Sequence, residues 1–304
     1  MNKAQTPAES AEIRGRSPWR AAWDSLRLVM QDSFAVVGVV ILVLFILIAL
    51  AAPSLAPFDP FKAMMTDTGR LARLRPPSGD YLLGTTAFGN DVLSQFLHGF
   101  RVALLVGLVA AIAVGFISTV FGVLSGYFGG WVDDVLMRIT DVALSIPTLP
   151  FSIVAVALLG PSIENIILVI TVLFWRNGAR IIRSAVLTER ERVYVKWARA
   201  AGASHLHIIL RHILPNIVRV IFLWVTMSVA FAILTEASLS FLGLGDPTVI
   251  SWGQMLNTAF SSGNLRTAWW WVVPPSLALV MLISALYLIG RAYEEQTNPR
   301  LRRR

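Results

Sequence analysis

Long stretches without a charged residue recur along this sequence. The clearest of them lie between Asp32 and Asp59, Arg101 and Asp133, Asp141 and Glu164, and Arg266 and Arg291. A helix needs about 20 apolar residues to cross the hydrocarbon layer of a membrane, and each of these stretches is long enough. Two weaker stretches follow Glu164, one interrupted by Arg176 and Arg180 and the other containing Glu236. The pattern predicts an all-α membrane protein with six spans, at 34–54, 100–126, 136–159, 164–186, 217–242 and 270–290.

The positions of lysine and arginine predict how these spans are oriented, because cytoplasmic loops carry an excess of both residues. With the N-terminus in the cytoplasm, most of the 26 basic residues fall on the cytoplasmic side. The exterior then holds only Lys62, Arg70, Arg73, Arg75, Arg101 and Arg266. We therefore expect both termini in the cytoplasm.

The remaining segments divide the chain further. Residues 1–18 are polar and are expected to form a disordered cytoplasmic tail, and 291–304 a basic cytoplasmic tail. The recurrence of Trp19, Trp23, Leu26 and Met30 predicts an amphipathic helix over 19–33 that lies in the membrane interface. An ordinary basic juxtamembrane stretch is the alternative. The six-span domain covers 34–290, with its core expected at 100–290, and its first span is interpreted as a retained anchor rather than a cleaved signal peptide.

Two exterior connections carry features of their own. The segment 53–99 is rich in proline and, at this length, is expected to be functional. The segment 243–269 leads into Trp269, Trp270 and Trp271, which are typical of an aromatic belt at the outer membrane interface. Stacking of these rings on a ligand is the alternative.

A cytoplasmic segment at 187–216 contains a candidate docking element. Its sequence favours helix up to Ala201, is interrupted by Gly202 and ends at Pro215. Glycine weakens a helix through its backbone entropy, and proline lacks the backbone N–H. We expect two short helices at an angle to each other, outside the bilayer. The alternative is a solvated basic loop.

Composition narrows the possible chemistry. Hydrophobic residues make up 56% of the chain and charged residues 14%, whereas soluble domains have about 45–50% and about 25%. The mean hydropathy is +0.66 and the net charge is +8. There is no cysteine, and the phosphate-binding motif G-x-x-x-x-G-K-[ST], the zinc motif H-E-x-x-H and the nucleophile motif G-x-S-x-G are all missing. The sequence predicts no catalytic residue, no metal site and no bound cofactor on this chain.

Arg176 and Glu236 lie deepest in the predicted spans. Ionisable residues at such depth are candidates for function. Either could line an aqueous path, or each could neutralise the other across two helices. The sequence leaves both interpretations open.

The docking element resembles the signature loop of bacterial ABC-importer permeases, which reads E-A-A, three residues, G, nine residues, I-x-L-P. Here Lys196, Trp197 and Ala198 stand at the triplet, Gly202 at the glycine, and His212-Ile213-Leu214-Pro215 at the end. The spacing is intact, although Lys196, Trp197 and His212 replace the usual residues.

Further motifs resemble the second, C-type permease of dipeptide, oligopeptide and nickel importers. They are Leu83-Gly84-Thr85, Gly126-Tyr127-Phe128-Gly129-Gly130, Gly160-Pro161-Ser162, Glu236-Ala237 with Phe241-Leu242-Gly243, and Asn298-Pro299-Arg300-Leu301. The likeness runs from about Trp19 to the C-terminus. The chain departs from the usual pattern at Thr86, Asn90 and Gln95, where the family has Asp, Arg and Arg.

The resemblance implies a transport subunit without enzymatic activity of its own, in a bacterial or archaeal cytoplasmic membrane. A second, different permease chain would complete the path, and two cytoplasmic ATPase subunits would bind ATP and Mg. A binding protein outside the membrane would deliver peptides, or alternatively nickel or an oligosaccharide. Contact with an ATPase would fall on Lys196, Trp197, Ala198, Arg199, Gly202, Ala203, Ser204, Leu206 and Pro215.

Two other classes compete with this interpretation. A secondary transporter would need no ATPase partner, but we find no repeated halves with paired broken helices. An intramembrane enzyme would need a nucleophile next to a base, and no convincing pair is present in the predicted spans.

Overall fold

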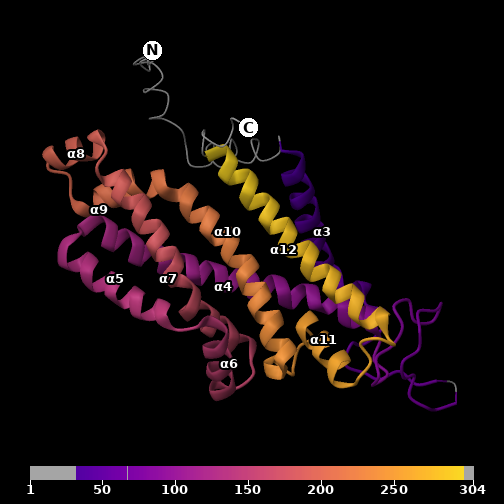
Figure 1. The fold of residues 1–304 in the computed structure, drawn as a ribbon. Helices are drawn as coiled ribbons and strands as arrows, with labels where there is room; N and C mark the ends of the chain where they lie inside the picture. Colours follow the sequence, from indigo (N-terminus) through magenta and orange to yellow (C-terminus); the bar gives the residue numbers. More distant parts are fainter. Residues whose placement is uncertain (1–31, 67, 298–304) are drawn as a thin grey trace.

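The computed structural model describes residues 32–66 and 68–297, and these residues form a helical bundle (Figure 1). Within these residues, five helices are long and apolar enough to cross a membrane. They contain α3 (Ser33–Leu55), α4 (Val92–Phe128), α7 (Ile163–Arg190), α10 (Leu214–Leu239) and α12 (Trp269–Thr297). The predicted helix at 19–33 lies almost wholly outside the described residues, as do the tail 1–18 and residues 298–304. Helix α12 extends beyond Gly290, so the predicted boundary of the C-terminal tail at 291 falls within it.

Polar residues beside the apolar stretches determine where the helices begin. The carboxylate of Asp32 accepts a hydrogen bond from the backbone N–H of Phe34 at 2.8 Å and caps α3. Asp91 accepts from the N–H of Ser94 at 2.8 Å and caps α4. Such caps satisfy amide groups that have no partner inside the helix. The cap at Asp91 explains why α4 begins well before the predicted span start at residue 100.

The predicted third span at 136–159 is bent rather than straight. It consists of α5 (Gly130–Ser145) and α6 (Thr148–Leu159), which meet at an angle of 85°. Pro147 lies at the junction and N-caps α6. Because proline has no N–H, the helix cannot continue through it without losing a hydrogen bond. Only if this bent pair counts as one span does the described chain reach six.

Glycines let the long helices approach one another closely. A Cβ atom at Gly122 of α4 would lie 2.7 Å from the Cβ of Ile182 on α7, and one at Gly126 would lie 2.7 Å from that of Val186. A Cβ at Gly178 of α7 would lie 2.1 Å from the indole nitrogen of Trp224 on α10. Small residues at such contacts are typical of helices packed within membranes. They make α4, α7 and α10 one tightly packed group.

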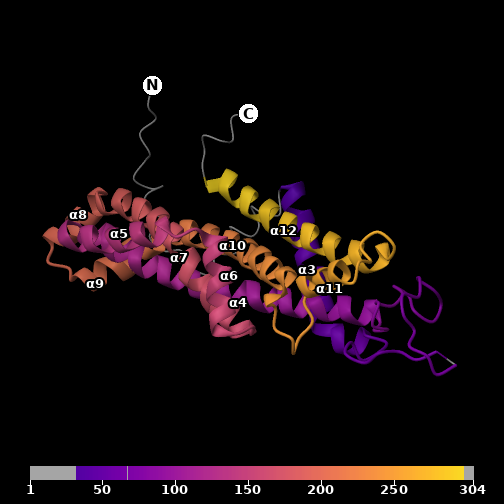
Figure 2. The ribbon, with the colours of Figure 1, turned by 60° about the horizontal axis from the view of Figure 1, so that its bottom comes forward.

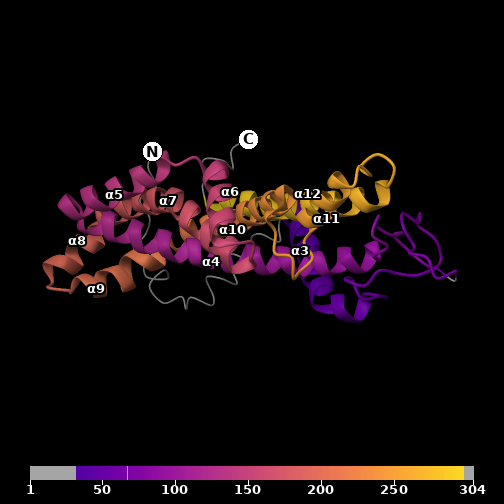
Figure 3. The same cartoon turned by 90° about the horizontal axis from the view of Figure 1, so that it is seen from below.

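The molecule is elongated, and its two extremities differ. One extremity carries α8 (Val193–Ala200) and α9 (His205–Ile208), and we call it the α8 end. The other carries the segment 56–91 and lies on the side of α11 (Trp252–Ser261), and we call it the α11 end (Figures 2 and 3). Figure 1 shows α3 and α12 side by side, with the first residues of α3 near the last residues of α12. Ala35 packs with Ala292 and Tyr293 in one apolar cluster there.

The Trp triplet does not form the predicted aromatic belt as a unit. Trp269 is 58% exposed, but Trp270 and Trp271 are buried in the core. The indole N–H of Trp270 donates to the carbonyl of Thr85 at 3.3 Å and so holds the segment 56–91 against α12. Helix α11 is a further addition to the expected fold. Its capping box, formed by Ser251 and Gln254, is a signal that the sequence displays.

Candidate coupling site at the α8 end

Helices α8 and α9 form a bent element directly after α7. Gly202 turns the chain between them with φ of +81°, a conformation that glycine adopts without strain. The hydroxyl of Ser204 then accepts from the N–H of His207 at 3.3 Å and caps α9. The predicted break at Gly202 is therefore present in the structure.

The second short helix does not end at Pro215 as predicted. It continues from His205 through a π turn, η2 (Ile209–Ile213), into α10 as one helix that reaches Leu244. Pro215 therefore lies inside a continuous helix, where its missing N–H removes one backbone hydrogen bond. The wider π turn just before Pro215 adapts the helix to the proline. We call residues 193–213 the coupling element, a name that follows the role expected from the resemblance.

One face of the coupling element is part of the protein core. Val195, Ile208 and Ile213 are fully buried, and they pack in one cluster with Val123 of α4 and Val186 of α7. Burial of each such side chain contributes about 1.5–3 kcal/mol. The element is thus attached to the bundle and is not a solvated loop.

Other large apolar side chains of the coupling element are exposed. Trp197 is 71% exposed and Leu206 is 65% exposed. A hollow of about 520 Å³ beside Leu206 is lined by Ser204, Leu206, His207, Leu210 and Arg211. Leu206 and Leu210 are both exposed beside this hollow, and neighbouring exposed apolar side chains of this kind are typical of an interaction surface.

The other residues predicted for this site lie around these exposed side chains. Lys196 pairs with Glu191 at 3.0 Å, and this hydrogen bond and charge lower the pKa of the Glu191 carboxyl. Arg199 is exposed, whereas Ala198 and Ala203 are half-buried at the inner edge. Pro215 is exposed but belongs to α10.

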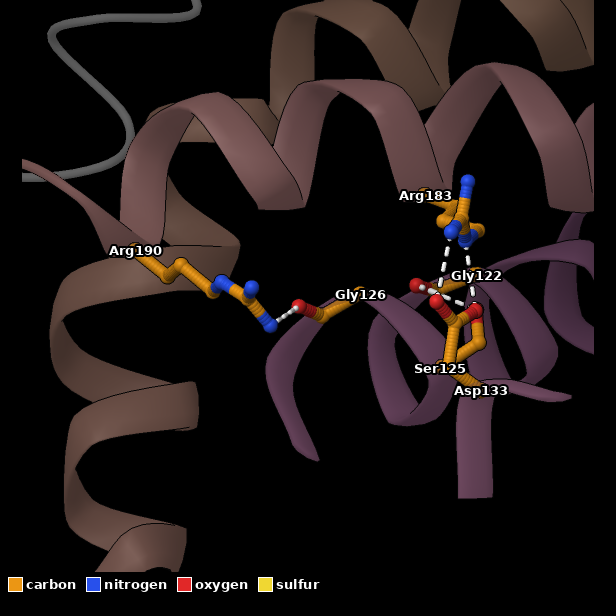
Figure 4. Close-up of polar contacts among 6 residues, drawn as sticks. All are labelled: Gly122, Ser125, Gly126, Asp133, Arg183 and Arg190. Atoms are coloured by element: carbon orange, nitrogen blue, oxygen red, sulfur yellow. Dashed lines mark hydrogen bonds and ion pairs between the residues drawn. The ribbon is translucent and has the colours of Figure 1, made fainter. Parts of the chain in front are cut away.

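Polar contacts that sequence reasoning missed fasten α7 to the helices beside it (Figure 4). Arg190 donates from Nη1 to the carbonyl of Gly126 at 2.8 Å. Arg183 donates from Nε to Oδ1 of Asp133 on α5 at 2.6 Å. Next to them, burial and a hydrogen bond to Glu189 raise the pKa of the Tyr194 hydroxyl. No spacing in the sequence signals the contacts of Arg183 and Arg190, because the partners are far apart along the chain.

Arg176 and Glu236 lie apart and do not neutralise each other. Arg176 is buried and donates to the carbonyl of Ala143 and, at 2.8 Å, to the hydroxyl of Thr148. Both acceptors flank the bend between α5 and α6. Glu236 is buried in α10 and accepts from the hydroxyl of Ser240 at 2.6 Å.

Comparison with known protein families identifies the chain. Residues 118–303 match the model of the binding-protein-dependent transport system inner membrane component. The chain belongs to this family. Residues 17–77 of this permease also match the N-terminal transmembrane domain of oligopeptide transport permease C. As a member of an inner membrane family with several apolar helices, it is a multi-pass protein of the cytoplasmic membrane.

Curated relatives match over nearly the full length of the permease. It is 32% identical to the dipeptide transport system permease protein DppC of Alkalihalophilus pseudofirmus, covering 98% of this chain and 95% of that protein. It is 35% identical to the DppC of Haemophilus influenzae, over 90% and 92%. It is also 34% identical to the glutathione transport system permease protein GsiD of Pectobacterium atrosepticum, over 94% and 93%.

The fold also resembles a solved structure of the MetNI methionine ABC transporter in an inward-facing conformation. The TM-score is 0.53 at 20% identity, and the match covers 67% of this chain and 97% of the other. This likeness supports the transporter fold without indicating a cargo.

Proposed function

We propose that this chain is one of the two membrane-spanning permease subunits of an ATP-driven importer. The observation that carries the proposal is the coupling element, which has one apolar face in the core and other large apolar side chains exposed. Separate ATPase subunits bind ATP and Mg, since the chain has no phosphate-binding motif of its own. A different permease chain completes the path.

The exposed face of the coupling element docks on an ATPase subunit. Trp197, Leu206 and Leu210 leave water on docking, and a buried leucine contributes about 1.5–3 kcal/mol. Lys196, Arg199 and Arg211 form a basic rim that steers the element toward an acidic surface. Closure of the ATPase subunits then displaces the coupling element. Helices α7 and α10 move with it, because the element is joined to both of them through the backbone.

The cargo class that we propose is peptides, handed over by a binding protein outside the membrane. Relatives named for dipeptide and glutathione transport support this choice. With both termini in the cytoplasm, as the distribution of lysine and arginine predicts, the α8 end lies in the cytoplasm and the α11 end faces the binding protein. Arg176 and Glu236 both find hydrogen-bond partners within this chain, which favours structural roles for them over lining of the path.

The proposal is tested with Leu206→Asp in the assembled complex. Leu206 is exposed in this chain, so the variant is expected to fold and insert, but ATPase subunits should not co-purify with it and ATP-dependent peptide uptake by vesicles should be lost. The matched control is Leu82→Asp, since Leu82 is 64% exposed at the opposite extremity. Normal ATPase binding and uptake by Leu206→Asp would contradict the docking site. Uptake that persists without any ATPase subunit would favour a secondary transporter.

A further inference from the structure

Tyr127 lies between the two helices of the coupling element. It belongs to the last turn of α4 and is 4% exposed. Its hydroxyl is 3.0 Å from Nδ1 of His205, the first residue of α9. The guanidinium carbon of Arg199, in α8, lies 5.7 Å from the centre of the Tyr127 ring. One buried side chain of α4 therefore contacts both α8 and α9.

Chain connectivity makes these contacts matter for motion. The coupling element continues directly from α7 and directly into α10, so both helices follow it through the backbone. Helix α4 has no such connection to the element. The neighbouring ring of Phe128 adds a contact of 5.7 Å to His205, and Val123 shares an apolar cluster with Val195. Motion of the element reaches α4 at this end through side chains of its last turns, in addition to the contacts of Arg190 and Val186 on α7 with Gly126.

We propose that Tyr127 is a positioning residue for energy coupling, which fastens α8 and α9 to the end of α4. This inference rests on the proposed docking of the coupling element to an ATPase subunit. The apolar contacts are non-directional and permit sliding, whereas the hydrogen bond between the Tyr127 hydroxyl and Nδ1 of His205 is directional and fixes the register of α9 against α4. When the bond is present, displacement of the element moves α4 as well as α7 and α10. Without it, ATP is hydrolysed while α4 follows incompletely.

The test compares Tyr127→Phe, His205→Ala and the double variant in the complete complex reconstituted in vesicles. Tyr127→Phe retains the ring and loses only the hydroxyl. The readouts are assembly with the ATPase subunits, ATP hydrolysis and peptide taken up per ATP hydrolysed. We expect normal assembly and hydrolysis, with uptake per ATP lower by roughly 2- to 10-fold, the range for loss of one hydrogen bond. The double variant should be no worse than the more severe single variant, since both remove the same bond.

The matched control is Tyr287→Phe, because Tyr287 is 59% exposed on α12 and lies outside the coupling element. Uptake per ATP equal to that of the unaltered complex in Tyr127→Phe, or additive losses in the double variant, would overturn the proposal. If Tyr127→Phe does not accumulate in the membrane, His205→Ala replaces it in the test, because His205 is exposed. Its uptake per ATP is then read by the same criteria. Normal assembly and uptake with Leu206→Asp would instead refute the proposed function itself. Loss of ATPase binding and uptake in Leu206→Asp, together with unchanged uptake per ATP in Tyr127→Phe, would refute only the role of Tyr127.

Discussion

At the scale of single residues, Arg176 shows how a buried charge supports an irregular backbone. The carbonyl of Ala143 would pair with the amide of residue 147 in a regular helix, but that residue is proline. Arg176 reaches from α7 and donates to this carbonyl, and it also donates to Thr148 at the start of α6. The N–H of Ile146 also donates to this carbonyl, at 3.3 Å, so Arg176 adds a second, charged donor that joins the two sides of the bend.

Arg176→Lys should therefore destabilise the permease by about 1–3 kcal/mol, because an ammonium cannot reproduce the planar fork that serves two acceptors. Thermal unfolding of the purified protein in detergent measures the change. Arg180→Lys on the same helix is the control, since Arg180 forms an exposed ion pair with Asp141 that lysine can replace at a cost of about 0–1 kcal/mol. Equal stability of the two variants would show that Arg176 does not support the bend.

Gly202 is a second residue whose backbone decides a local shape. Its φ of +81° disfavours any side chain, although no atom within 4 Å would obstruct a Cβ. Gly202→Ala should cost about 1 kcal/mol in backbone strain and lower the affinity for the ATPase subunits by roughly 5-fold. Gly263→Ala carries the same kind of strain, with φ of +74° and open surroundings, but lies toward the α11 end. Co-purification titrations should show reduced affinity for the first variant only, and an equal loss in both would argue against a special role for the turn at Gly202.

At the scale of elements, the central group of helices is held at distances that only glycine permits. Gly178 on α7 lies against both Trp224 of α10 and Ser118 of α4. The hydroxyl of Ser118 would lie 2.5 Å from a Cβ atom added at Gly178. Ser118 also donates to the carbonyl of Trp175 at 2.8 Å. Three helices therefore meet at one point without space for a methyl group.

Gly178→Ala should destabilise the permease by about 1–3 kcal/mol, the usual cost of overpacking a dense core. Val172→Ile adds one carbon to the same helix at a position that is 48% exposed and should be nearly neutral. The unfolding temperatures of both variants in detergent give the comparison. A neutral Gly178→Ala would mean that α10 can move away from α7 at little cost, which would contradict the tight packing described above.

At the scale of the whole molecule, the two extremities differ, and this difference defines how the protein is oriented in the membrane. The α8 end carries the coupling element, whereas at the α11 end Trp270 holds the segment 56–91 to α12. The proposed function requires these ends to lie on opposite sides of the membrane.

Cysteine labelling of intact cells tests this arrangement, and the absence of native cysteine leaves no background. Gly79→Cys, in an open exposed position, should react with a membrane-impermeant reagent added from outside. Glu191→Cys, at a residue whose side chain is 61% exposed at the α8 end, should react only after the membrane is opened. Labelling of both from outside would overturn the orientation.

The sequence alone determined the features that depend on local composition. Apolar stretches bounded by charged residues such as Asp32 predicted the membrane helices, and the isolated Gly202 predicted the turn of the coupling element. These two predictions succeed because the length of an apolar stretch and the backbone conformation of a glycine are set by residues that are neighbours in the chain. The same reasoning failed at Pro215, where a π turn carries the helix past a residue expected to end it.

The tertiary structure alone decided the contacts between distant residues. Ala143 and Arg176 meet across the bend, Trp270 is buried against Thr85, and Tyr127 reaches His205. A proline shows that a helix is interrupted, but the angle and the donor that stabilises it depend on which helix packs alongside. An aromatic triplet likewise suits either a membrane interface or a core, and packing decides between them. Long-range packing sets these outcomes because the free energy of a buried polar or aromatic group depends on its partners in space, which neighbouring residues in the chain do not specify.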